Sequence, residues 1–99
     1  MVRGSMAKIT RNQAEQIVNA FTEVSQISET YTDVEVSKCI KEDCYTLASV
    51  KYQYRDIEIF LSLDGVSTTI YYVSYCTIVG NVLSIGGSGG CVDVIIIDD

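Results

Sequence analysis

The sequence predicts an α+β domain in which one N-terminal amphipathic helix packs on an antiparallel meander sheet of about five strands. Apolar residues follow a helical period near the N-terminus, and alternating runs separated by tight-turn dipeptides fill the second half. Asp64-Gly65 and Gly80-Asn81 are such dipeptides, because they accept the positive φ angles of two-residue hairpin turns. The helical and strand patterns therefore occupy separate parts of the chain, as in α+β proteins.

The chain has 99 residues, which is the size of one domain. Residues 1–5 read Met-Val-Arg-Gly-Ser, and we interpret them as an expression-tag remnant before a single domain at 6–99. A domain this small buries only about 60–65% of the surface of its unfolded chain. Association would bury more, so the length favours a homo-oligomer.

Residues 11–27 are expected to form the helix. Thr10 and Gln13 have the Thr-x-x-Gln spacing of a capping box, in which each residue bonds the backbone of the other. The apolar residues that follow recur three or four positions apart and form one stripe: Ala14, Ile17, Val18, Phe21, Val24 and Ile27. Such a helix needs an apolar surface to cover, and the predicted sheet supplies one.

Residues 33–47 fit two patterns. Val34 and Val36 alternate as in a strand, whereas Ile40 and Cys44 are four positions apart as in a helix. Periodicity over so short a segment does not separate the two structures. The β-branched residues and the polar break after Ile40 favour a strand and a hairpin.

Residues 48–54 and 57–63 alternate between apolar and polar side chains, with Arg55-Asp56 as a weaker turn signal between them. This alternation is typical of strands with one buried face and one wetter face. Two further strands are therefore expected here.

The segments 66–79 and 91–97 carry apolar residues on both faces. In a regular strand Tyr72 shares a face with Ile70, and Val73 lies on the opposite face. One helix cannot cover both faces of a sheet. Either the sheet folds over itself as a partial barrel or a second subunit covers the outer face, and for so small a chain the sequence favours the homodimer.

The glycine-rich segment Gly86-Gly87-Ser88-Gly89-Gly90 separates the last two apolar runs. A phosphate-binding loop would be followed by a helix, whereas Cys91 onward has a strand pattern. We therefore expect a flexible connection between two strands.

Composition excludes several classes of function. The net charge is −6, and the seven basic residues are scattered, so direct binding to nucleic acid is not expected. Histidine is absent, which removes the commonest general base and metal ligand, so we expect neither an enzyme nor a metal or cofactor site. No apolar run approaches the ~20 residues of a membrane span, and the chain is expected to be soluble and cytoplasmic.

The four cysteines, Cys39, Cys44, Cys76 and Cys91, have three interpretations. Their spacing is a poor match to the paired knuckles of zinc sites. A hairpin looping through residues 40–43 would place Cys39 opposite Cys44 for a disulfide, and Cys76 and Cys91 could lie on neighbouring strands. Free, buried thiols are the third interpretation, and it is the one we favour.

Tyrosine is the remaining feature, with seven residues in the chain. Tyrosine is common in strands and enriched in protein interfaces. The candidate interaction surface comprises Tyr52, Tyr54, Tyr71 and Tyr75.

The sequence thus favours a small acidic, non-enzymatic protein-interaction module that is homodimeric and has a protein partner. One alternative is an acidic inhibitor of a nucleic-acid enzyme, of phage or viral origin. Another is a small-molecule-binding domain with a pocket between helix 11–27 and the sheet, in which Asp93 would act if its apolar strand buries it.

Overall fold

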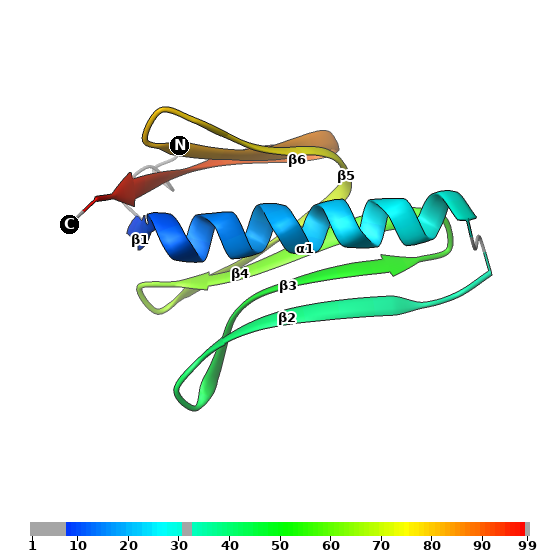
Figure 1. Ribbon diagram of the computed structural model, residues 1–99, viewed down its shortest axis with the longest axis horizontal. Helices are drawn as coiled ribbons and strands as arrows, with labels where there is room; N and C mark the ends of the chain where they lie inside the picture. The colour runs from blue at the N-terminus through cyan, green and yellow to red at the C-terminus, as the bar shows by residue number, and fades with distance from the viewer. Residues whose placement is uncertain (1–7, 31–32, 99) are drawn as a thin grey trace.

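The structure is a computed structural model that describes residues 8–30 and 33–98. Its elements are β1 (Lys8–Thr10), α1 (Arg11–Thr30), β2 (Val36–Glu42), β3 (Tyr45–Gln53), β4 (Asp56–Leu63), β5 (Val66–Val79) and β6 (Val82–Ile97). The strands form one sheet in the order β1-β6-β5-β4-β3-β2, on which α1 packs (Figure 1). The predicted α+β class is confirmed, with six strands in place of about five. The predicted tag remnant at 1–5 lies outside the described residues.

Helix α1 begins at the predicted capping box. The Thr10 N–H donates to the Gln13 side-chain oxygen at 2.9 Å, and the Gln13 N–H donates to the Thr10 hydroxyl at 3.1 Å. The helix continues to Thr30, three residues beyond the predicted end. Its buried face consists of Ala14, Ile17, Ala20 and Val24. No described helix has the combination of length and apolar character that crossing a bilayer requires.

The hairpin of β2 and β3 confirms the strand interpretation of the ambiguous segment, but the turn lies at Asp43-Cys44 and not at residues 40–43. The hairpin also contains a bulge. Ile40 pairs with Ala48 whereas Lys41 pairs with Thr46, so Leu47 is an extra residue in β3. This bulge buries both Leu47 and Ala48, which regular alternation would place on opposite faces.

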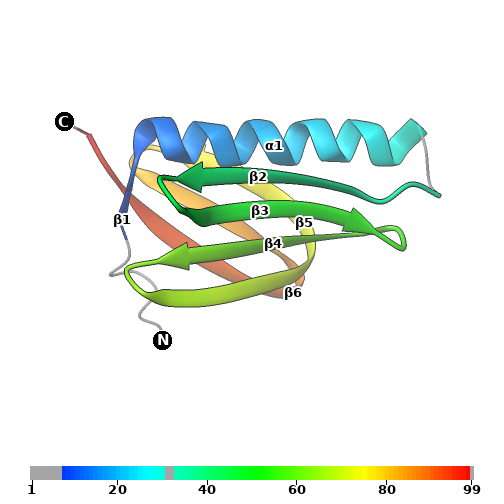
Figure 2. The same cartoon turned by 90° about the horizontal axis from the view of Figure 1, so that it is seen from below.

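Strand β5 bends and joins two parts of the sheet. Its residues 66–70 pair with β4, whereas its residues 71–79 pair with β6. The sheet consequently curves around α1 (Figure 1), and the direction of β6 is at an angle to that of β3 and β4 (Figure 2). A strand that changes direction through bulges is a common way to turn a sheet corner.

Two irregularities at this bend overturn the predicted faces of β5. Tyr72 has a φ of 53°, and the register with β6 shifts between Val73 and Tyr75. Each irregularity reverses the alternation of side chains, since side-chain direction in a strand has a period of two. As a result Val73 is buried together with Ile70, whereas Tyr72 is exposed.

Strand β6 doubles back on itself, and Figure 1 shows its return toward the C-terminus. The Ile96 N–H donates to the Asn81 carbonyl at 2.7 Å, and a Cβ built on Gly86 would lie 2.8 Å from the Cys91 Cβ. In a straight strand Gly86 and Cys91 would lie about 16 Å apart. The returning half pairs in parallel with β1, the strand that the sequence did not predict.

The core lies on the side of the sheet that faces α1. Its largest fully buried side chains come from the helix and from strands β3, β4 and β6: Ile17, Val24, Val50, Ile59, Leu61, Leu83, Ile85 and Val94. Among the described residues no polar or charged side chain is fully buried. The sheet curves around the helix. This curvature buries part of the apolar surface that one helix on a flat sheet would leave exposed.

Candidate functional site

The sequence contains no charged residue between Gly65 and Asp93, although 20% of the chain is charged. The fold brings this segment together, because it comprises β5 and most of β6, which are neighbours in the sheet. Its exposed large side chains include Val66, Tyr71, Tyr72, Tyr75 and Val79. We call the surface formed by the three exposed tyrosines of β5 and the facing glycines of β6 the tyrosine face.

The structure separates the four tyrosines of the predicted interaction surface. Tyr71 and Tyr75 are 51% and 42% exposed and lie on β5. Tyr54 is 84% exposed but lies in the turn between β3 and β4. Tyr52 is 3% exposed and belongs to the core, so its place on the predicted surface was wrong. It alternates in phase with Val50, which also faces inward.

Tyr72 is a surface residue that sequence reasoning missed. It is 55% exposed because its positive φ turns it away from the core. The absence of charge from residues 66–92 is the signal that could have located this surface, since every tyrosine in that segment is exposed.

Glycines lie opposite the tyrosines across the two strands. Gly89 pairs with Tyr71, Gly87 with Val73 and Gly86 with Tyr75. A Cβ at Gly86 would collide with the Tyr75 phenol oxygen, and Cβ atoms at Gly87 and Gly89 would collide with the carbonyl oxygens of β5. The glycine-rich segment connects two halves of β6, as expected, but Gly86, Gly87 and Gly89 are at the same time paired with β5.

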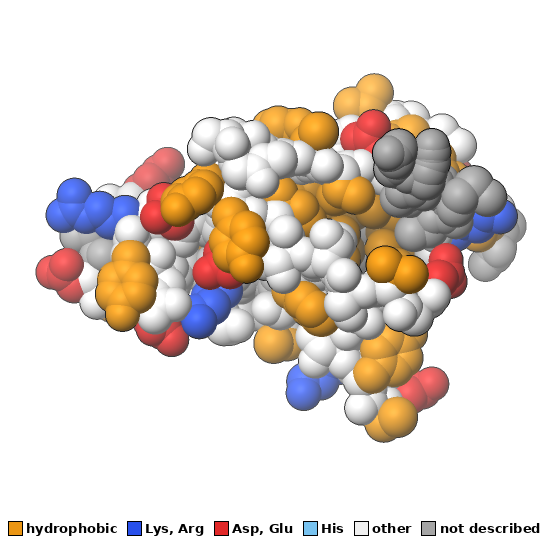
Figure 3. All heavy atoms as spheres, turned by 180° about the vertical axis from the view of Figure 1, so that it is seen from behind, with side chains coloured by type: hydrophobic (Ala, Val, Ile, Leu, Met, Phe, Trp, Pro, Cys, Tyr) orange, Lys and Arg blue, Asp and Glu red, His pale blue; other side chains and the backbone are white. Residues whose placement is uncertain are grey.

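The chemistry of the tyrosine face suits binding more than catalysis. Tyrosine offers a large contact area at a small loss of side-chain entropy, and serine and glycine supply adaptable hydrogen bonds. Interface centres are depleted in charge and enriched in aromatic residues. On the side of the molecule away from α1, uncharged and hydrophobic side chains occupy the middle of the view, and charged ones lie mostly toward its ends and margins (Figure 3).

All four cysteines are free thiols, and Cys39, Cys44 and Cys91 are exposed. Cys39 pairs with Ser49, whereas Cys44 lies in the turn, so the predicted opposition of these two cysteines was wrong. Cys76 faces the core, whereas Cys91 is exposed on β6. The position of the turn explains the outcome for Cys39 and Cys44, because a turn at Asp43-Cys44 pairs Glu42 with Tyr45 and leaves Cys44 outside both strands.

Burial raises the pKa of the Cys76 thiol to about 12, which makes this residue a poor nucleophile. Within residues 8–30 and 33–98, no three side chains of Cys, Asp, Glu or His gather into a group that could hold a metal ion. Asp93 is exposed on β6 and is not buried in an apolar strand as one alternative required.

The turn between β3 and β4 is the most unusual local geometry near the surface. It lies at Tyr54-Arg55, one residue before the predicted Arg55-Asp56. The φ angles of Tyr54 and Arg55 are 54° and 72°, which match the 52° and 76° of the Asp64-Gly65 turn. Positive φ angles are rare for bulky residues and suit Asp-Gly far better.

Hollows that are lined by described residues lie at the edge of the molecule. One has a volume of about 390 Å³ and lies beside the Tyr54-Arg55 turn. A second, of about 290 Å³, lies between α1 and β2 and is lined by Glu23, Gln26, Ile27, Thr30 and Lys38. Lys38 and Glu23 form an ion pair of 3.8 Å in this second hollow. This second hollow lies at the surface, between the end of the helix and the sheet.

Comparison of the chain with protein-family models, with curated proteins and with solved structures finds no match.

Proposed function

We propose that the protein is a non-enzymatic interaction module that forms a homodimer through its tyrosine face. The observation that carries the proposal is the charge-free segment from Val66 to Val92, on which Tyr71, Tyr72 and Tyr75 are exposed. These features match the centres of protein interfaces.

A second copy of the chain is a suitable occupant of this face for an electrostatic reason. A two-fold interface places each surface patch against itself. In a chain with a net charge of −6, a charged patch would repel its copy. A neutral patch of hydroxyl-bearing aromatic side chains avoids that repulsion and offers hydrogen-bond donors and acceptors on both sides.

The strained backbone of Tyr72 supports the proposal that this surface is an interface. A bulky residue at positive φ is destabilising by roughly 1–2 kcal/mol. Such residues cluster at functional sites, where the surrounding structure holds them in place. Here the strained residue presents its side chain to solvent on the charge-free face.

Sedimentation equilibrium tests the proposal. The wild-type protein should have a mass near twice the 10.9 kDa of the chain. Thr77→Lys introduces a charge on an exposed position of β5, two residues beyond Tyr75, and should give a monomer, because burial of an unpaired charge in the interface is unfavourable. Thr22→Lys on the exposed face of α1 is the matched control and should leave the dimer intact. A wild-type monomer at high concentration, or a dimer of Thr77→Lys, would contradict the proposal.

A further inference from the structure

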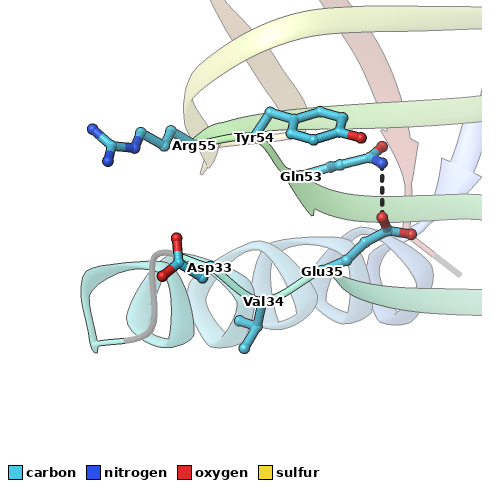
Figure 4. Close-up of a pocket in the computed structure, with 6 residues that line it drawn as sticks. All are labelled: Asp33, Val34, Glu35, Gln53, Tyr54 and Arg55. Atoms are coloured by element: carbon cyan, nitrogen blue, oxygen red, sulfur yellow. Dashed lines mark hydrogen bonds between the residues drawn. The ribbon is translucent and has the colours of Figure 1, made fainter.

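The pocket beside the β3–β4 turn is built from two segments that are distant in the sequence. One segment precedes β2 and the other ends β3, and the lining residues are Asp33, Val34, Glu35, Gln53, Tyr54 and Arg55. Figure 4 shows the two segments facing each other across the hollow. Its volume of about 390 Å³ is enough for the end of one long side chain.

Some of the side chains at the pocket point into it, and one extends away from it. The Gln53 Nε2 donates to the Glu35 Oε2 at 2.7 Å, which holds the Glu35 carboxylate at the wall. Arg55 extends away from the pocket in Figure 4. The pocket is therefore left with two carboxylates, of Asp33 and Glu35, and with the exposed ring of Tyr54.

The turn holds Tyr54 and Arg55 at φ angles that Asp64 and Gly65 adopt with less strain in the same sheet. The turn alone therefore does not require a tyrosine at position 54. Its side chain is 84% exposed and contributes nothing to the buried core. A role in contact with another molecule accounts for a bulky aromatic residue at a position that suits asparagine or glycine.

We propose that this pocket receives an arginine side chain of a basic protein partner. A guanidinium group is planar, pairs with a carboxylate through two parallel hydrogen bonds and stacks on an aromatic ring. Asp33 and Glu35 supply the carboxylates, and Tyr54 supplies the ring. The net charge of −6 draws a basic partner toward the molecule.

This inference goes beyond the proposed homodimer and does not depend on it, because the pocket lies at the β3–β4 turn and not on the tyrosine face. The mass of the wild-type protein tests dimerisation, and peptide binding tests the pocket. Failure of either proposal can therefore be recognised separately.

The test is a titration of the full chain with acetyl-hexaarginine amide, followed by amide NMR shifts and isothermal calorimetry at low ionic strength. Acetyl-hexalysine amide is the control peptide, because it has the same charge without the planar group. The arginine peptide is expected to bind about threefold to tenfold more tightly, and the largest shifts are expected at residues 33–35 and 53–55.

Two matched double variants distinguish binding at the pocket from attraction by the net charge of the chain. The double variant Asp33→Asn with Glu35→Gln removes two charges at the pocket, which lies where β2 and β4 begin. The control double variant, Asp43→Asn with Asp64→Asn, removes two charges just beyond the other ends of the same two strands. Asparagine tolerates the φ of 52° at both control positions. The pocket variant should weaken binding of the arginine peptide by about tenfold, and the control by less than about twofold.

Tyr54→Asn should abolish the preference for arginine over lysine without weakening the fold, because asparagine suits the turn. Equal binding of the two peptides by the wild-type protein would overturn the inference. Equal losses in the pocket variant and the control variant would also overturn it, since binding would then follow net charge alone.

Discussion

The phenol of Tyr75 lies against Gly86, its partner across strands β5 and β6, and leaves no room there for a side chain. An aromatic ring that covers a glycine shields backbone that the glycine would leave exposed. The same contact places Tyr75 beside a glycine of the tyrosine face. One residue pair thus links the stability of the bent sheet to the surface that we propose as an interface.

Alanine substitutions at three glycines should have graded effects on stability. Gly87→Ala should be the most destabilising, by about 3 kcal/mol, because its Cβ would meet the backbone of Tyr72 and Ser74. Gly86→Ala should be milder than Gly87→Ala, because the Tyr75 ring can move, although its Cβ would also lie 2.8 Å from the Cys91 Cβ and the returning half of β6 would have to shift. Gly65→Ala meets nothing within 4 Å and should cost about 1–2 kcal/mol, from its φ of 76° alone.

Urea unfolding of the three variants measures this order. Equal losses at Gly65 and Gly87 would mean that the glycine-rich half of β6 does not pack against β5 as described.

Relief of strain at the β3–β4 turn should stabilise the protein. Tyr54→Asn combined with Arg55→Gly replaces two residues at positive φ with the pair that type I′ turns prefer. The free energy of unfolding should rise by about 1 kcal/mol, and Tm by about 4–8 °C. Thermal unfolding followed by circular dichroism measures the change, with Asp64→Asn as a control that should leave Tm nearly unchanged.

The four thiols should react in two classes. Cys39, Cys44 and Cys91 are exposed and should react rapidly with a disulfide reagent at pH 8, whereas Cys76 should react only after denaturation. The thiolate is the reactive form, and burial disfavours it at Cys76. Rapid reaction of a fourth thiol in the native protein would contradict the burial of Cys76.

The raised pKa of Cys76 also predicts a dependence of stability on pH. The folded state holds the proton to about pH 12, whereas the ordinary thiol pKa is 9.0. The unfolded chain therefore binds fewer protons between these values, and the free energy of unfolding should fall as pH rises from 9 to 12. Cys76→Ala removes this contribution, so the variant should lose less stability than the wild type over the same range.

Asp98 should contribute to stability only when it is ionised. Its Oδ1 accepts a hydrogen bond from the Arg11 Nε at 2.7 Å, and Arg11 also donates to the Gly80 carbonyl at 3.0 Å. The hydrogen bond from Arg11 lowers the pKa of the Asp98 carboxyl below its ordinary 3.8. Its stabilisation is present above pH 3.8 and is lost as pH falls through the lowered value.

Asp98→Asn should therefore lower Tm slightly at pH 7, and the difference from wild type should vanish in strong acid. High salt should also reduce this difference in Tm, because the side chains of Arg11 and Asp98 are both more than one third exposed. A difference that persists unchanged in acid would indicate a role for Asp98 other than its ion pair.

Local features of the fold were predictable from the sequence. The capping box of Thr10 and Gln13 fixed the start of α1, because it depends on two residues three positions apart. The turns at Asp64-Gly65 and Gly80 were predicted for a similar reason, since their positive φ angles follow from residue type.

The candidate site was predicted only in part. Tyr71 and Tyr75 are exposed as expected, whereas Tyr52 is buried and Tyr72 was missed. The pocket beside Tyr54 could not be predicted, because Asp33 and Tyr54 come to line one hollow only through the pairing of β2 with β3.

The sequence by itself determined the helix, the meander and the charge-free segment from Val66 to Val92, because each depends on residues near one another in the chain. Tertiary structure decided which side chains of β5 face the core and where β6 reverses. The physical reason is the period of two in a strand: one extra residue reverses every side chain beyond it. Close packing against neighbouring strands sets where such a residue lies, as the register shift between Val73 and Tyr75 and the return of β6 at the glycines illustrate.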